Sequence, residues 1–213
     1  IQPPKEPLIN ASEANVDLQV SYLSGGGAGN TAVKLRWQTQ PRHMTFSDFD
    51  GFIFANGAVK EEISRRSFGE YDYEEAEEGR AQKLMFQSSE LVLDAAGGIR
   101  AGIKNIPRVS APHNIHAELE FKDPNGEIQT VSTNVPLWPS KVMVGIKPDA
   151  WAMSKESFKF HIATADLTGK AVPHTPITVE LFQRKYYSHR KRLVGGFYSY
   201  EHVTETKRIG QIC

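Results

Sequence analysis

Two closely spaced histidines, His113 and His116, are the first residues in this sequence whose type and spacing suggest chemistry. Imidazole nitrogens bind zinc when several ligands converge on one point. Apolar residues alternate with polar ones from Ile115 onward, which predicts a β-strand, and a spacing of three then sends the two rings to opposite faces. No ligand spacing relates the other histidines, which are His43, His161, His174, His189 and His202. We therefore expect no metal site.

The run from Gly25 to Gly29 has the composition of a loop that cradles phosphate. Such loops lie between a strand and the N-terminus of a helix, and they carry a Lys-Ser/Thr pair or a third spaced glycine. Here the next apolar residues, Val33, Leu35 and Trp37, alternate with polar ones and predict another strand. We therefore expect a flexible turn and no nucleotide or other cofactor.

A cluster of carboxylates occupies Glu70, Asp72, Glu74, Glu75, Glu77 and Glu78. Calcium prefers oxygen ligands, but the known calcium loops place them at alternating positions around a central glycine. This cluster lacks that arrangement. A solvated acidic loop is the expected structure.

A basic, tyrosine-rich segment near the end of the sequence has the composition of a nucleic-acid contact. Its cations and rings are Arg184, Lys185, Tyr186, Tyr187, Arg190, Lys191 and Arg192. The competing interpretation is a charged hairpin whose tyrosines pack locally or against a neighbouring domain. The chain carries 25 basic and 25 acidic residues, so it lacks the overall charge that draws proteins to nucleic acids or anionic membranes. We expect no nucleic-acid partner.

Arrangements that support catalysis are missing from the sequence. It contains no nucleophile elbow, no zinc-protease helix and no paired His and Cys. Cys213 is the only cysteine and the last residue, so no disulfide forms within the chain. We expect a protein that is not an enzyme and has no catalytic residue, and any disulfide partner of Cys213 would lie outside this chain.

Apolar and polar residues alternate with a period of two along most of the chain, which predicts β-strands. Hydrophobic residues make up 39% of the 213 residues, which is enough for packed cores. No segment long enough to form a helix has apolar residues at helical spacing. Short strands with turn signals between them are typical of an all-β sandwich. The predicted strands include Val16–Tyr22, Val33–Trp37, Gly51–Ala55, Lys83–Gln87, Leu91–Asp94, Ile99–Ile103, Ile115–Phe121, Ile128–Ser132, Val142–Ile146, Phe158–Ile162 and Ile177–Leu181.

Two of the connections carry the residues of tight turns. Asp123-Pro124-Asn125-Gly126 separates two alternating segments and predicts a hairpin. Ala95-Ala96-Gly97-Gly98 separates Leu91–Asp94 from Ile99–Ile103, and we predict a second hairpin there.

The sequence from Leu18 to Trp37 and the sequence from Phe160 to Phe182 share an order of strand, glycine-containing loop and strand. This repetition supports two related modules. Prolines near 136 and 139 mark the boundary between them. We predict a linker or the end of a preceding domain at 1–13, one sandwich at 14–139 and a second at 140–213. The second holds about four strands, so we expect its closing strands beyond Cys213 or on another chain.

The N-terminal residues, Ile1 to Pro7, do not have the basic-then-apolar order of a signal peptide, and the chain begins without Met. Its apolar runs are also shorter than the ~18 residues that suggest a membrane span. We interpret the sequence as an internal segment or a processed chain whose targeting information lies elsewhere.

Several stretches resemble bacterial alpha-2-macroglobulins, in the N-terminal half of those long proteins. They are SYLSGGGAGNTAVKLRW, LDAAGGIRAGI, ELEFKDPNGEIQTVST, LWPSKVMVGIKPDAW, ADLTGKAVPHTPITVELFQRK and YYSHRKRLVGGFYSYEHVTETK. The last of these, around Tyr186 to Tyr200, is the most specific. Together they cover nearly the whole chain.

This resemblance implies tandem macroglobulin-like domains, each a seven-stranded antiparallel β-sandwich, with the second incomplete here. It also implies a periplasmic protein, anchored to a membrane by a distant lipid, that traps endopeptidases after they cleave a bait segment. The partners implied are neighbouring domains of the same protein and the target endopeptidases. Many members also carry a Cys-Gln thioester, but nothing follows Cys213 in this sequence to form one. In the family, a cysteine here suits a structural disulfide with a downstream cysteine.

A role in surface adhesion or ligand binding is the alternative, because tandem β-sandwiches also host such functions. It predicts an exposed aromatic cluster that lines an open groove, formed by Tyr186, Tyr187, Tyr198 and Tyr200. Burial of these rings at a domain junction would remove the reason for this alternative.

Overall fold

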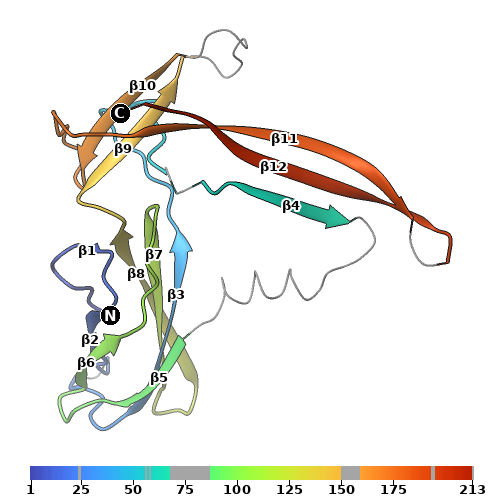
Figure 1. The fold of residues 1–213 in the computed structure, drawn as a ribbon. Coiled ribbons are helices and arrows are strands. Elements are labelled where there is room, and N and C mark those ends of the chain that lie inside the picture. Colours follow the sequence, from blue (N-terminus) through green and yellow to red (C-terminus); the bar gives the residue numbers. More distant parts are fainter. Residues whose placement is uncertain are drawn as a thin grey trace. The chain divides into compact units, whose positions relative to one another are not determined.

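The computed structural model describes residues 1–23, 25–55, 57, 59–67, 87–149, 159–192 and 195–212. Its regular elements in these ranges are β-strands, as shown in Figure 1. The strands are β1 Leu8–Ile9, β2 Ala14–Gln19, β3 Ala32–Pro41, β4 Glu62–Ser67, β5 Gln87–Val92, β6 Gly98–Ile103, β7 His113–Lys122, β8 Ile128–Trp138, β9 Val142–Pro148, β10 Phe160–Asp166, β11 Val179–Arg192 and β12 Tyr198–Ile212. The prediction of an all-β fold is confirmed.

One sandwich dominates the first part of the chain. A five-stranded sheet has the order β1-β8-β7-β3-β5, and a two-stranded sheet pairs β2 with β6. The alternation seen in the sequence places every second side chain inward, and both sheets contribute to one core cluster. Leu18, Leu35, Ile103, Ile115 and Leu119 are at most 2% exposed. Each such burial contributes about 1.5–3 kcal/mol relative to exposure.

The two predicted hairpins have different outcomes. Strands β7 and β8 form the predicted hairpin, in register from Lys122↔Ile128 to His113↔Leu137. The prediction of a hairpin around Ala95–Gly98 is wrong, because β5 pairs with β3 in one sheet while β6 pairs with β2 in the other. The turn between β5 and β6 therefore leads from one sheet of the sandwich to the other. Asp94 fixes it by accepting hydrogen bonds at Oδ1 from the amides of Ala96 and Gly98, both at 2.8 Å.

The glycine-rich run packs against this crossing turn. A Cβ atom on Gly27 would lie 1.8 Å from the carbonyl oxygen of Ala96, and one on Gly97 would lie 2.5 Å from that of Val20. Val20 donates its amide to Gly97 O and accepts a hydrogen bond from Ala28, both at 2.9 Å. A strand follows the run, as predicted. At Gly27, however, glycine is required by close backbone contact, which corrects the expectation of a merely flexible turn.

Residues 1–13, for which the sequence suggested a linker or the end of a preceding domain, pack against the first sandwich. Gln2 bridges to Asp17, and β1 pairs in parallel with the end of β8. The side chain of Asn10 donates to Pro139 O at 2.7 Å and accepts from Val109 N at 3.1 Å. Ile1 and Leu8 pack on the core cluster.

A second core lies beside the antiparallel pair of β9 and β10. The predicted strand at 51–55 is reduced to a single bridge between Ile53 and Ile146. Phenylalanines at 46, 49, 52 and 54 gather instead, with Phe54 fully buried and its ring centroid 4.8 Å from that of Phe46. A Cβ atom on Gly145 would lie 2.6 Å from the ring of Phe54. Ring packing therefore determines the structure of this segment.

The chain divides into two compact units, Ile1–Asn56 with Gln82–Val172, and Gly57–Ala81 with Pro173–Cys213. These limits differ from the predicted ranges 14–139 and 140–213, because β9 and β10 belong to the first unit and β4 pairs with β12 in the second. Within residues 141–212, the described residues form four strands, the number predicted, and do not close a sandwich by themselves. Additional closing strands beyond Cys213 stay a prediction.

Candidate interaction surface

The second unit is built on a three-stranded sheet with the order β11-β12-β4. Strands β11 and β12 run side by side over their whole length (Figure 1), in register from Arg192↔Tyr198 to Val179↔Ile212 with one irregularity after Leu181. Paired residues in adjacent strands point to the same face, and successive residues point to opposite faces. The register therefore determines which charges share a face.

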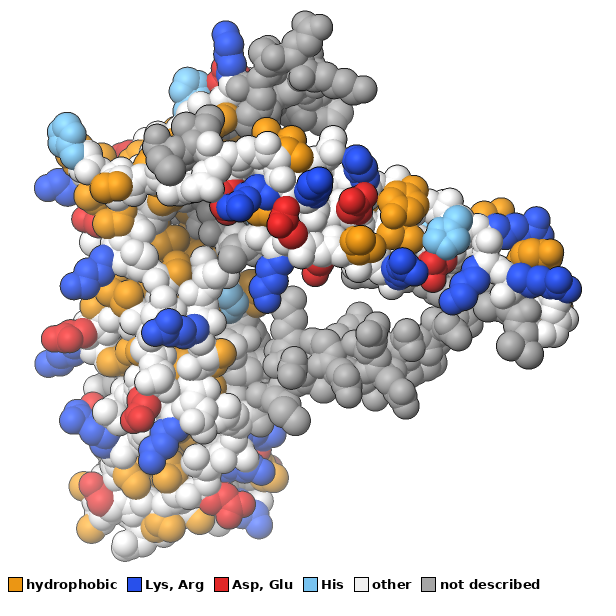
Figure 2. Space-filling view, in the orientation of Figure 1, with side chains coloured by type: hydrophobic (Ala, Val, Ile, Leu, Met, Phe, Trp, Pro, Cys, Tyr) orange, Lys and Arg blue, Asp and Glu red, His pale blue; other side chains and the backbone are white. Residues whose placement is uncertain are grey.

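One face of the hairpin combines arginines with tyrosines. We call it the arginine–tyrosine face; it consists of Arg184, Tyr186, Arg190, Arg192, Tyr198 and Tyr200. The rings of Tyr186, Tyr198 and Tyr200 are 72%, 54% and 58% exposed. The guanidinium of Arg190 lies 3.9 Å from the centre of the Tyr198 ring, a cation–π contact. Figure 2 shows Lys and Arg side chains beside hydrophobic ones toward the far end of this hairpin.

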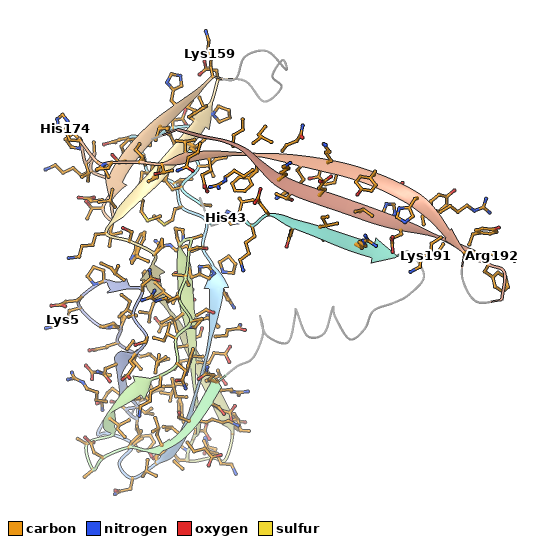
Figure 3. The ribbon with its side chains drawn as sticks, in the orientation of Figure 1. Lys5, His43, Lys159, His174, Lys191 and Arg192 are labelled. Carbon is orange, nitrogen blue, oxygen red and sulfur yellow. The ribbon has the colours of Figure 1, made fainter. Side chains whose placement is uncertain are left out.

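The opposite face contains Glu201 and Glu205, the two acidic residues of β12. Glu201 is 8% exposed and lies between His189 and Lys191: its Oε2 is 2.8 Å from His189 Nε2, and its Oε1 is 3.7 Å from Lys191 Nζ. Lys185 faces Glu205 across the strands. Figure 3 labels Lys191 and Arg192, which are adjacent on β11 and therefore belong to opposite faces of the sheet. From Lys185 to Lys191 and their partners on β12, the two lysines of this second face are matched by two glutamates, Glu201 and Glu205.

An ion pair and a hydrogen bond hold the other end of the sheet. Arg208 Nη1 donates to Glu180 Oε1 at 2.7 Å, and the backbone amide of Arg208 donates to Glu61 Oε1 at 2.7 Å. The hydrogen bond that Arg208 donates to Glu180 raises the pKa of Arg208 above its ordinary value, and the charges of the nearby carboxylates add to this. These contacts join β11 and β12 to the segment that leads into β4.

The four tyrosines of the adhesion alternative are exposed, as that alternative requires. Tyr187 is 49% exposed but points to the face opposite Tyr186, because the two are adjacent on β11. The four rings therefore do not line one groove.

The histidines fall where strand geometry predicts. His113 and His116 lie on opposite faces of β7; His113 Nδ1 is 2.8 Å from Ala111 O and His116 Nδ1 is 2.9 Å from Asn134 Oδ1. His161 Nε2 pairs with Asp149 Oδ1 at 2.7 Å. Within the described ranges, no group of three or more His, Cys, Asp or Glu residues is placed to hold a metal ion.

Three sequence predictions fall on residues outside the described part of the structure. They are the acidic cluster at 70–78, most of the strand at 83–87, and Cys213. The possible disulfide from Cys213 to another chain segment therefore stays a prediction.

The first unit carries an open depression of about 650 Å³ at one end of its five-stranded sheet. Its lining mixes apolar side chains, among them Val92 and Ile128, with Lys34, Glu90 and Glu120. Glu120 forms an ion pair with Arg36 on the same sheet. Opposite charges alternate across these strands, which is the ordinary pattern of a solvated sheet face.

Sequence reasoning identified the basic segment but not its one-sided organisation. Strand geometry alone assigns each residue to one of two faces within its own strand. Matching the faces of two strands requires their register, which depends on the length of the turn. The pairing of Arg190 with Tyr200 supplies that information.

The structure contains no helix, within its described residues, that is long and apolar enough to cross a membrane.

No protein-family model matches this sequence, and no curated protein matches it. Solved structures of bacterial alpha-2-macroglobulins do match the fold. The native E. coli protein has a TM-score of 0.65 at 14% identity, over 99% of this chain and 14% of that one. The Salmonella protein reacted with methylamine has a TM-score of 0.65 at 15% identity, with the same coverage.

The E. coli protein activated by porcine elastase has a TM-score of 0.63 at 16% identity, over 97% of this chain and 17% of that one. The chain therefore spans a small part of the length of the proteins that it matches. At these identities the likeness establishes the fold. This chain has the fold of a segment of bacterial alpha-2-macroglobulins, as the sequence resemblance predicts.

Proposed function

We propose that this chain is a structural segment of a bacterial alpha-2-macroglobulin, a larger protein that traps endopeptidases after they cleave an exposed bait segment. The main support is the match of 99% of the chain to 14% of the native E. coli protein. That E. coli protein has been solved in a native conformation and in forms activated by elastase and by trypsin. Conversion between such forms by a protease is what a trap requires.

Within the larger protein, this chain acts as scaffold. Its first unit joins two sheets through a close-packed turn and buries a continuous apolar core, features that suit a rigid body. Rigid domains transmit a rearrangement because their interfaces switch between discrete arrangements. The bait segment and any thioester lie outside this chain, and its direct partners are neighbouring domains of the same protein.

The proposal extends to location and to Cys213. A periplasmic protein held by a lipid anchor would fractionate with membranes, and removal of the lipidated terminus would release it. Cys213 would form a disulfide with a cysteine outside this chain, which peptide mapping under non-reducing conditions detects. Recovery of Cys213 only as a free thiol from the oxidised protein would contradict the disulfide.

Trapping is tested with the full-length protein and elastase. We expect a molar excess of the protein to abolish cleavage of a large substrate such as casein. The isolated 213-residue chain is the control, and it should inhibit nothing because the bait lies elsewhere. Undiminished casein cleavage in excess full-length protein would count against trapping.

A further inference from the structure

Within the described part of the chain, no strand pairs with the outer edge of β11. β11 has 14 residues, about 46 Å at 3.3 Å per residue, and occupies the edge of the sheet β11-β12-β4. Among the described residues, β12 is its only hydrogen-bonded neighbour. An edge strand presents a row of backbone amides and carbonyls, and an extended peptide can pair with them by strand addition.

The arginine–tyrosine face beside this edge carries uncompensated positive charge. From Arg184 to Arg192, the residues of β11 and β12 on this face include no carboxylate, whereas Glu201 and Glu205 point to the other face. The nearest carboxylates on this face are Glu180, which pairs with Arg208, and Glu62 on β4, which is separated from Arg184 by Thr206. Among the described residues, no carboxylate forms an ion pair with Arg184, Arg190 or Arg192. The cations of the second face already have acidic neighbours. Between residues 184 and 192 of β11 and their partners on β12, the unbalanced positive charge is therefore confined to one face.

The chemistry of the partner follows from the spacing of these side chains. Guanidinium groups bind carboxylates through paired hydrogen bonds, and exposed tyrosines add apolar contact area. A strand added beside β11 projects every second side chain onto the arginine–tyrosine face. Carboxylates at alternate positions of that strand would lie next to the arginines, as opposite charges do across paired strands.

We propose that β11 binds an acidic polypeptide as an added β-strand, with carboxylates at alternate positions that pair with Arg184, Arg190 and Arg192. The proposal goes beyond the scaffold role and does not depend on protease trapping. A polypeptide is favoured over a nucleic acid because only a polypeptide completes the backbone pairing of the edge.

The first test compares two labelled nine-residue peptides on the 213-residue chain by fluorescence anisotropy. One peptide alternates glutamate with threonine and carries five glutamates. The other has the same composition with its five glutamates consecutive. We expect the alternating peptide to bind at least about fivefold more tightly, because its carboxylates share one face. Equal affinities would overturn the proposal, since attraction by net charge alone treats the peptides alike.

The second test uses paired variants that remove equal charge from opposite faces. The R184A/R190A variant should bind the alternating peptide about tenfold more weakly than the unsubstituted chain, whereas the K185A/K191A variant should lose less than twofold in affinity. Equal losses would overturn the one-sided site. Circular dichroism checks that each variant keeps its β-sheet, and the peptide comparison on the unsubstituted chain requires no variant.

Hydrogen exchange distinguishes strand addition from surface attraction. Saturation with the alternating peptide should slow exchange of amides within 179–192, because the added strand accepts their hydrogen bonds. Unchanged exchange at saturation would overturn strand addition. A single-stranded oligonucleotide of equal charge serves as the competing partner, and tighter binding of the oligonucleotide would overturn the polypeptide assignment.

Discussion

Gly97 and Gly126 both have positive φ angles, +81° and +90°, but their surroundings differ. Gly97 lies in the crossing turn against the backbone of Val20 and Ala28, whereas a Cβ atom on Gly126 would meet nothing within 4 Å. Sequence analysis placed both in turns. It could not distinguish them, because the atoms that crowd Gly97 belong to a segment about 70 residues away.

This difference predicts unequal costs for the same substitution. Gly126→Ala should lower the free energy of unfolding by about 1 kcal/mol, the strain of a positive φ in a residue with a side chain. Gly97→Ala should cost about 3 kcal/mol or more, because the new methyl also displaces backbone. Urea denaturation of both variants measures these costs. Equal losses would contradict the close contact.

Asp166 shows how a turn lowers an acid's pKa. Its Oδ1 accepts hydrogen bonds from Thr168 Oγ1 at 2.7 Å, from Thr168 N at 2.8 Å and from Lys170 N at 3.0 Å. The bond from the Thr168 side chain is the main cause that lowers the pKa of Asp166 below its ordinary value. The ionised carboxylate therefore stabilises the fold above about pH 4, and this stabilisation is lost as the pH falls through the folded-state pKa.

We predict that Thr168→Val raises the pKa of Asp166 toward its ordinary value, because the variant removes the largest cause of the shift. NMR titration of the Asp166 carboxyl carbon measures this pKa. Thr164→Val is the control, since the Thr164 hydroxyl donates to Val172 O and not to Asp166. An Asp166 that titrates identically in the native chain and in Thr168→Val would refute this account.

At the scale of elements, alternation predicted where strands lie better than which strands pair. β3 and β7 fall within a few residues of their predicted ranges because one face of each is buried in the core. The turn from Asp94 to Gly98 was predicted to close a hairpin, but it connects strands of different sheets. The same turn residues occur in both kinds of connection. Sheet membership depends on contacts that the local sequence does not contain.

The segment at 51–55 was predicted as a strand and is instead organised by phenylalanine packing. Phe54→Ala should lower the free energy of unfolding by about 3–5 kcal/mol, because it removes a ring with no solvent exposure. Ile53→Ala, at an adjacent residue that is 60% exposed, should cost less than about 1 kcal/mol. Thermal or urea unfolding compares the two variants. Similar losses would show that the phenylalanine cluster contributes little.

At the scale of the whole molecule, the pairing of β4 with β12 joins residues about 140 positions apart. The sequence predicted two modules in chain order, whereas the second compact unit takes a strand from the first half of the chain. No periodicity within either segment signals this pairing. Family resemblance predicted the fold of the chain correctly, because it draws on residues across the whole length.

The central claim, that this fold serves a protease trap, is tested most directly by titrating elastase with the full-length protein. Two substrates are followed in the same titration, casein and a small chromogenic peptide. A trap encloses the protease without blocking its active site, so casein cleavage should fall to an end point near molar equivalence while peptide cleavage continues. Loss of both activities in parallel, or retention of both beyond equivalence, would contradict the account.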